Sequence, residues 1–209
     1  MKLIIKVLFA FVAASSATAA DTSTESSATH LEGRSQYTAP RAAVAPIIDG
    51  RADDEAWSNA PWRNIDKHWL GPEYTAEDFS GRYKVVWTKD RIFILAEITD
   101  DILFDGHRDP LSQYWDDDCL EIFLDEDFSG GDHQYNHNAF AYHVSLDNQS
   151  IDIGTDQSAR DYSDHVESQW RQTGDSIVWE IAIQIYGDDY EDDAADNRPV
   201  ELFAGKVLG

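Results

Sequence analysis

The stretch SIVWEIAIQI, residues 176–185, constrains the fold most, because its apolar side chains recur at every second position. A strand points alternate side chains to opposite faces, whereas a helix repeats its apolar positions every three or four residues. One face of this stretch holds four isoleucines and a tryptophan: Ile177, Trp179, Ile181, Ile183 and Ile185. Glu180 falls on the opposite face. We therefore expect a strand whose apolar face packs against another layer.

Further segments show the same type of pattern. Residues 81–90 and 139–146 alternate, and residues 92–98 are apolar on both faces, as in a central strand. The segments 81–90 and 92–98 are connected through the short polar turn at 89–91 and form a predicted hairpin. Helical signal is limited to a possible turn in DDEAWSNA, residues 53–60. The sequence thus predicts an all-β fold, a β-sandwich or jelly roll.

The two ends of the chain differ from this pattern. Residues 1–20 combine Lys2 and Lys6 with an apolar run at 7–14 and small residues up to Ala19, as in a secretory signal peptide. A membrane-spanning helix needs about 20 apolar residues, so we expect no membrane insertion and a secreted or periplasmic protein. We expect a leader or linker at 21–42 and one domain at 43–209. Because the chain stops on the apolar rise ELFAGKVLG, we expect that its C-terminal strands are missing here.

Charge and cysteine content narrow the function. The formal net charge is −24, which repels nucleic acid and suits calcium or neutral ligands such as sugars. Cys119 is the only cysteine, so an intrachain disulfide is excluded. Its position in the apolar run CLEIFL predicts a buried, inert thiol.

The stretch YWDDDCLEIFLDED, residues 114–127, carries the candidate chemistry. Sugar rings present flat C–H faces that lie on indole, and their hydroxyl groups need charged acceptors. Trp115 and Glu121 supply one of each. In the alternative interpretation, Glu121 pairs with a cation such as Lys84 and Trp115 only covers a sheet edge.

Four segments together resemble a family 9 carbohydrate-binding module. They are PIIDGRADDEAWSNAPW (46–62), KVVWTKDRIFILAEITDD (84–101), the stretch 114–127 and SIVWEIAIQI. The resemblance covers roughly residues 44–209. It implies a β-sandwich that binds xylan- or glucan-type oligosaccharides without cleaving them, in secreted glycan-degrading systems. A partner glycoside hydrolase is implied as well, and any hydrolase activity would come from it.

The resemblance also assigns site residues. Trp115 would form one wall of the sugar slot, beside Tyr114, and Glu121 would bind sugar hydroxyls. His143 stands where the family has an arginine, and the facing tryptophan would lie beyond Gly209. Trp69, with Trp62 and Tyr74, is a candidate aromatic rim. The remaining strand tryptophans are core candidates: Trp57, Trp87 and Trp179.

Two groups of residues suggest metal binding. Asp125, Asp127 and Ser129 place oxygen donors at alternate positions before a glycine, like the first half of a calcium loop, although Asn136 stands where a closing glutamate is expected. A solvated acidic turn is the alternative. His133, His137 and His143 could suggest a transition metal, against scattered loop histidines.

Two other functions compete with sugar binding. A haem-binding domain of the related DOMON type commonly uses a methionine and a histidine as axial ligands, but Met1 is the only methionine here. A glycosidase would need a pair of catalytic carboxylates. A chain with 40 acidic residues contains many such pairs, so their presence does not distinguish a glycosidase from the other functions.

Overall fold

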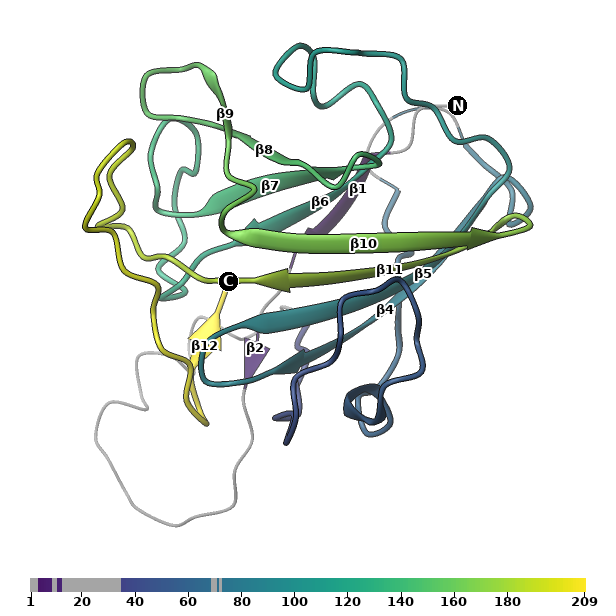
Figure 1. Ribbon diagram of the computed structural model, residues 1–209, viewed down its shortest axis with the longest axis horizontal. Coiled ribbons are helices and arrows are strands. Elements are labelled where there is room, and N and C mark those ends of the chain that lie inside the picture. Colours follow the sequence, from purple (N-terminus) through teal and green to yellow (C-terminus); the bar gives the residue numbers. More distant parts are fainter. Residues whose placement is uncertain (1–3, 9–10, 13–34, 69–70, 72) are drawn as a thin grey trace.

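The computed structural model describes residues 4–8, 11–12, 35–68, 71 and 73–209. Two sheets face each other (Figure 1), which confirms the predicted all-β sandwich. The first sheet holds, in spatial order, β1 (Ile4–Leu8), β6 (Cys119–Leu124), β7 (Phe140–Ser145), β8 (Ser150–Ile153) and β9 (Ala159–Asp161). The second holds β10 (Val166–Thr173), β11 (Ser176–Ile183), β5 (Ile92–Asp100), β4 (Phe79–Trp87) and β3 (Arg63–Asn64).

Short elements complete the described chain. β12 (Val207–Leu208) pairs with β2 (Phe11–Val12), and the expected turn at 53–60 is a 3₁₀ helix, η1 (Glu55–Trp57). β4 and β5 form the predicted antiparallel hairpin, in which Trp87 lies opposite Ile92. β5 and β11 are central in their sheet, as the apolar character of 92–98 indicated.

The main core lies between the two sheets and follows the alternation of the sequence. β11 contributes Ile177, Trp179 and Ile181 from its predicted apolar face. The first sheet contributes the inward side chains of β6 and β7, which are Leu120, Ile122, Leu124, Phe140, Tyr142 and Val144. Trp57, Trp87 and Trp179 are all buried, which confirms them as core residues. Cys119 is buried too, and burial raises the pKa of its thiol.

The packed region begins earlier than the expected boundary at residue 43. Tyr37 and Ala39, in the stretch expected to be a leader, belong to the main core. The Tyr37 hydroxyl donates to the Pro61 carbonyl at 2.7 Å and accepts the Val85 N–H at 3.0 Å. An aromatic ring that fills space beside β4 and satisfies two backbone groups is part of the fold, so the boundary has to be moved towards the N-terminus.

Most of the predicted signal peptide, including Ala19 and Ala20, lies outside the described residues. Of its described parts, β1 lies parallel to β6 and β2 pairs with β12. Cleavage of this segment and the missing C-terminal strands stay predictions. Within the described ranges, no helix has the length and apolar character needed to cross a membrane.

A second packed layer covers the opposite face of β11 and centres on Glu180. This side chain is fully buried, although the alternation pattern placed it on the polar face. Its Oε2 accepts the N–H groups of Asp49, Gly50 and Arg51 at 3.1, 3.0 and 3.2 Å. Burial raises the pKa of Glu180, and these backbone donors act against that rise. Residues 49–51, which we call the opening segment, are therefore fixed to the second sheet through the carboxylate of Glu180.

Candidate functional site

The candidate site begins on the outer face of β6 and β7. Leu120 and Ile122 are apolar and take the core face of β6, so Glu121 between them points outward. The register places Glu121 directly opposite His143 on β7. Both side chains are buried, at 3% and 8% exposure, so they face a covered part of the sheet and not open solvent.

Glu121 and His143 interact directly. Nε2 of His143 lies 3.5 Å from Oε1 of Glu121, and Nδ1 lies 2.9 Å from the carbonyl oxygen of Ala141. Because a carbonyl only accepts, Nδ1 carries a hydrogen and Nε2 is the ring nitrogen that faces the carboxylate. The sequence named both residues as candidates, and the strand register brings them together.

The alternative partner for Glu121 is excluded by the same geometry. Lys84 Nζ donates to the Trp57 carbonyl at 2.8 Å and lies 4.6 Å from the Trp62 ring centroid, on the outside of the second sheet. The interpretation that Lys84 neutralises Glu121 is therefore wrong.

Two aromatic rings continue the site from His143 to the surface. The Tyr114 ring meets the His143 ring edge-on, with centroids 4.8 Å apart, and Trp115 meets Tyr114 in the same way at 5.0 Å. Trp115 is 49% exposed, whereas Tyr114 is half-buried. The four residues form one row, which we call the Trp115–Glu121 row. It runs from an open indole through Tyr114 and His143 to a buried carboxylate.

Tyr114 also contributes a hydroxyl group. Burial raises the pKa of Tyr114 to about 12, and the nearby charges of Asp152 and Glu121 act in the same direction. The hydroxyl therefore keeps its proton at neutral pH and can donate a hydrogen bond. The row combines an apolar platform, a hydroxyl donor and a carboxylate acceptor.

The loop that carries Tyr114 and Trp115, residues 101–118, is held by two of the three aspartates that follow them. The Asp117 carboxylate accepts the N–H groups of Gly106 and His107 at 2.9 Å each, and it also bonds to His107 Nδ1 at 2.9 Å. Asp118 accepts the Phe104 N–H at 2.7 Å. The bond to Asp117 raises the pKa of His107. Asp117 and Asp118 therefore position Tyr114 and Trp115, and their carboxylates already accept hydrogen bonds within the loop.

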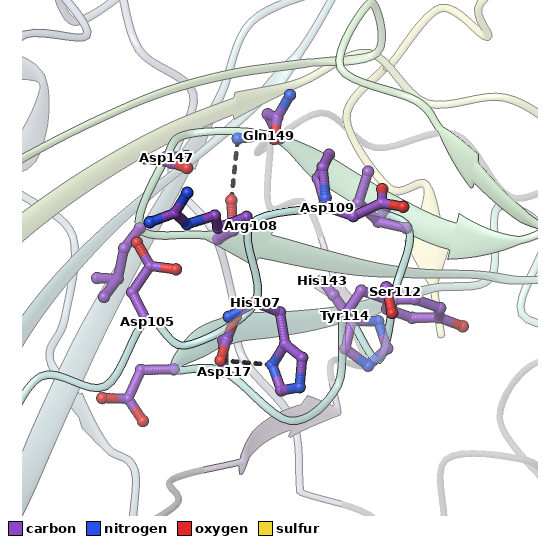
Figure 2. Close-up of a pocket in the computed structure, with 15 residues that line it drawn as sticks. Asp105, His107, Arg108, Asp109, Ser112, Tyr114, Asp117, His143, Asp147 and Gln149 are labelled. Atoms are coloured by element: carbon purple, nitrogen blue, oxygen red, sulfur yellow. Dashed lines mark hydrogen bonds and ion pairs between the residues drawn. The ribbon is translucent and has the colours of Figure 1, made fainter.

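A hollow lies beside the row, between this loop and the β7–β8 turn (Figure 2). Tyr114 and His143 line it on one side, and Asp105, Arg108 and Asp147 stand around it. Since Tyr114 and His143 belong both to the row and to the wall of the hollow, a ligand on the row has open space next to it. Sequence reasoning gave no signal for Arg108 or Asp147, because the hollow depends on how two distant loops meet.

Of the expected aromatic rim, the two described residues, Trp62 and Tyr74, do not lie at the row. Trp69 lies outside the described residues. Trp62 stacks under Arg82, whose guanidinium is 4.2 Å from its centroid, and Tyr74 packs edge-on against Phe79 at 5.4 Å. Arg82 and Phe79 belong to β4, so Trp62 and Tyr74 pack on the other sheet.

The candidate calcium residues form a turn closed by its own hydrogen bonds. Asp125 accepts the N–H groups of Asp127 at 3.2 Å and Gly130 at 2.7 Å, and Asp127 accepts the Ser129 N–H at 2.9 Å. In the part of the chain that the structure describes, no group of three or more His, Cys, Asp or Glu side chains is placed to hold a metal ion. This arrangement does not fit a cation cage, and calcium binding stays a prediction.

The three candidate histidines are separated. His133 meets Phe123 edge-on at 4.9 Å, His137 bonds to Asp192 at 3.1 Å, and His143 belongs to the row. Each has a different surrounding, so the geometry supports scattered histidines and not a transition-metal site.

Comparison with known proteins places the chain in a family. The sequence profile described as "Carbohydrate family 9 binding domain-like" matches residues 48–201. Endo-1,4-beta-xylanase A of Thermotoga neapolitana is 27% identical over 81 residues, which is 39% of this chain and 7% of that enzyme. The match therefore spans only a small part of the xylanase.

Two solved structures of a family 9 carbohydrate-binding module from Caldicellulosiruptor kristjanssonii are also similar. The complex with cellotriose gives a TM-score of 0.41 at 21% identity, over 67% of this chain and 63% of that one. The complex with glucose gives 0.45 at 17% identity, over 80% and 81%. The profile match, which takes in 154 of the 209 residues, is the more extensive sequence result. The chain belongs to the carbohydrate family 9 binding domain-like family.

Proposed function

We propose that this chain is a non-catalytic carbohydrate-binding domain whose ligand lies on the Trp115–Glu121 row. The observation that carries the proposal is a half-exposed indole that is linked through the Tyr114 ring to a buried carboxylate–imidazole pair. An exposed tryptophan alone is common. Here the tryptophan is accompanied by a hydroxyl donor, Tyr114, and a buried carboxylate acceptor, Glu121. Together they supply the apolar surface and the polar groups that a sugar ring needs.

Each member of the row has a distinct part in binding. The C–H face of a pyranose packs on Trp115, and the edge contact with Tyr114 limits rotation of the indole. Glu121 accepts hydrogen bonds from ring hydroxyls, and the low exposure of the pair strengthens those bonds because little water competes. Since Nδ1 of His143 already carries a hydrogen, Nε2 donates to the carboxylate when it is protonated as well and the ring is an imidazolium. Binding of this kind needs no bond cleavage, which agrees with membership of a binding family.

The family and the xylanase relative support β-linked plant polysaccharides as the ligand class, of the xylan or glucan type. A glycoside hydrolase is then the natural partner, and the domain would concentrate it on its substrate. The signal-peptide pattern supports a secreted or periplasmic location.

A glycan array tests this proposal. The purified protein is applied to xylo- and gluco-oligosaccharides together with anionic and unrelated glycans, and positive spots are repeated by titration calorimetry. We expect saturable binding to neutral β-linked oligosaccharides and no hydrolysis products. The absorption spectrum of the same sample tests the haem alternative. A Soret band with no glycan binding would overturn the proposal.

A further inference from the structure

The hollow beside the Trp115–Glu121 row offers polar groups that the row itself does not use. Tyr114 lies on one side of this hollow. Asp105, Arg108 and Asp147 gather on the other side (Figure 2). Tyr114 also contacts Trp115, with ring centroids 5.0 Å apart. The hollow therefore begins one side chain away from the exposed indole, where the next ring of a bound oligosaccharide would lie.

One wall of the hollow, the turn between β7 and β8, is tied to the second sheet by two hydrogen bonds. Trp170 Nε1 on β10 donates to the Leu146 carbonyl at 2.7 Å. Ser168 Oγ, also on β10, donates to Asn148 Oδ1 at 3.0 Å. Asp147 lies between these two anchored residues and is exposed. A fixed backbone thus presents its carboxylate to the hollow.

The other wall is the loop 101–118, whose own hydrogen bonds fix the backbone around Arg108. The N–H group of His107, the preceding residue, donates to Asp117 at 2.9 Å. Directly after Arg108, Asp109 Oδ1 accepts the Leu111 N–H at 3.1 Å. The Arg108 side chain is itself exposed, so its guanidinium is open to a ligand. Both walls are therefore built before a ligand arrives.

The charge of the hollow favours a neutral ligand. Against one arginine and one histidine, it is lined by five aspartates, which are Asp105, Asp109, Asp117, Asp118 and Asp147. Burial, and then the charges of Asp147 and Asp117, raise the pKa of Asp105, so these carboxylates already repel one another. An anionic sugar would add to this repulsion. A neutral sugar can donate its hydroxyl hydrogens to the carboxylates and accept from the guanidinium.

Resting on the proposed function, we infer that the hollow is a second carbohydrate subsite, in which Arg108 and Asp147 bind the hydroxyl groups of a neutral sugar ring next to the one on Trp115. Arg108 donates and Asp147 accepts, so hydrogen bonds hold this ring and no second aromatic platform is needed. Because both walls are fixed in advance, little ordering of the protein opposes binding. The subsite favours neutral oligosaccharides over monosaccharides and over chains that place a uronic acid in the hollow.

The first test compares ligand lengths in calorimetric titrations of the parent, Arg108→Gln, Asp147→Asn and Trp115→Ala. The ligands are xylose with xylotriose and glucose with cellotriose, and the parent should bind one trisaccharide more tightly than its monosaccharide. For Arg108→Gln and Asp147→Asn we expect roughly threefold to tenfold weaker binding of that trisaccharide and unchanged binding of the monosaccharide. Asp90→Asn changes an exposed aspartate between β4 and β5 and is the matched control, which should bind like the parent.

The second test compares ligand charge at low ionic strength. The bound trisaccharide is replaced by two derivatives, in which either the first or the last ring is the corresponding uronic acid. We expect the parent to bind at least one derivative about fivefold or more weakly than the neutral sugar. Asp147→Asn and added salt should narrow this difference, whereas Asp90→Asn should not.

The outcomes separate this inference from the proposed function. If Arg108→Gln and Asp147→Asn bind the trisaccharide like the parent while Trp115→Ala has lost binding, the second subsite is wrong and the proposed function stands. An equal loss for monosaccharide and trisaccharide would also reject it, and equal affinity of the parent for neutral and acidic trisaccharides would reject the selection for a neutral ring. If the parent binds none of these sugars, both proposals fail. Thermal melts of every variant establish that the fold is retained.

Discussion

The indole Nε1 of Trp57 donates a 2.9 Å hydrogen bond to Oε1 of Glu180, and both side chains are buried. The other carboxylate oxygen is held by three consecutive backbone N–H groups at 49–51. The aspartate–glycine turn and the tryptophan eight residues after Asp49 therefore serve one structural purpose. They close the opening segment over the second sheet, far along the chain from the Trp115–Glu121 row.

Glu180→Gln tests this structural role. Glutamine presents an NH₂ group to donors on one side or the other, so at least one set of hydrogen bonds is replaced by facing donors. Leaving buried donors unsatisfied costs about 2–4 kcal/mol in the free energy of unfolding. Urea denaturation of parent and variant measures the difference.

Glu97→Gln is the matched control. Glu97 lies on β5 and pairs with Arg82 in a partly exposed ion pair, which contributes about 0–1 kcal/mol. If Glu180→Gln destabilises the protein no more than this control, the role of Glu180 in fixing residues 49–57 to the second sheet is rejected.

Gly50→Ala tests the turn that supplies the central N–H group. Gly50 has a φ of 76°, and an added Cβ would lie 2.8 Å from the backbone carbon of Trp170. Gly174 has a similar φ of 63° but open space around it, so Gly174→Ala measures the conformational strain alone. We expect Gly50→Ala to lower the melting temperature clearly more than Gly174→Ala. Equal shifts would contradict the tight contact between this turn and β10.

Acid sensitivity is expected from His165. Nδ1 bonds to the Tyr142 hydroxyl at 2.8 Å and Nε2 to the Tyr190 hydroxyl at 3.2 Å, and burial lowers the pKa of His165 to about 4. In the unfolded chain the imidazole takes up a proton at about pH 6.5, so protonation favours unfolding between that pH and about 4. The stability that neutral His165 contributes is complete above pH 6.5 and is lost as the pH falls.

Denaturation at pH 7 and pH 5 measures this effect in the parent and in His165→Gln. The parent should lose more stability between the two pH values than the variant does. Burial raises the pKa of Asp152 to about 6, which acts in the opposite direction, but Asp152 is present in both proteins and its effect cancels. The same loss in both proteins would show that His165 is not the group responsible.

The local alternation of apolar and polar residues was sufficient to predict most strands. It was insufficient to predict which side chains are buried by a segment that is distant in the sequence. The alternation at 176–185 predicted β11, yet it placed Glu180 on a polar face, because only the segment at 49–57 turns that face into an interior. Residues 21–42 are rich in serine and threonine and carry no apolar period, so the sequence predicts a leader or linker that includes Tyr37. Its hydrogen bonds to Pro61 and Val85 come from tertiary packing.

The candidate site divides in the same way. Trp115 and Glu121 carry their chemistry in one short stretch, so the sequence identified them. That His143 meets Glu121 follows from the register of β6 and β7, which a long connecting loop leaves undefined in the sequence.

Glu121→Gln separates the polar part of the proposed site from the aromatic part. The amide keeps the shape of the side chain but removes the charge, so hydrogen bonds from sugar hydroxyls become weaker and are not lost. We expect a smaller loss of affinity than for removal of the indole. A Glu121→Gln variant that binds oligosaccharide as tightly as the parent would exclude the carboxylate from the site.

The most direct test of the account is the calorimetric titration of Trp115→Ala with a xylo- or gluco-oligosaccharide that the parent binds. Removing an aromatic anchor commonly costs about 2 kcal/mol or more, which is roughly thirtyfold in affinity. Trp115 is 49% exposed, so the variant should melt like the parent. Phe203→Ala, which removes another exposed ring at 61%, is the control and should bind normally. We predict near-complete loss of binding for Trp115→Ala alone, and an isotherm identical to that of the parent would contradict the proposed site.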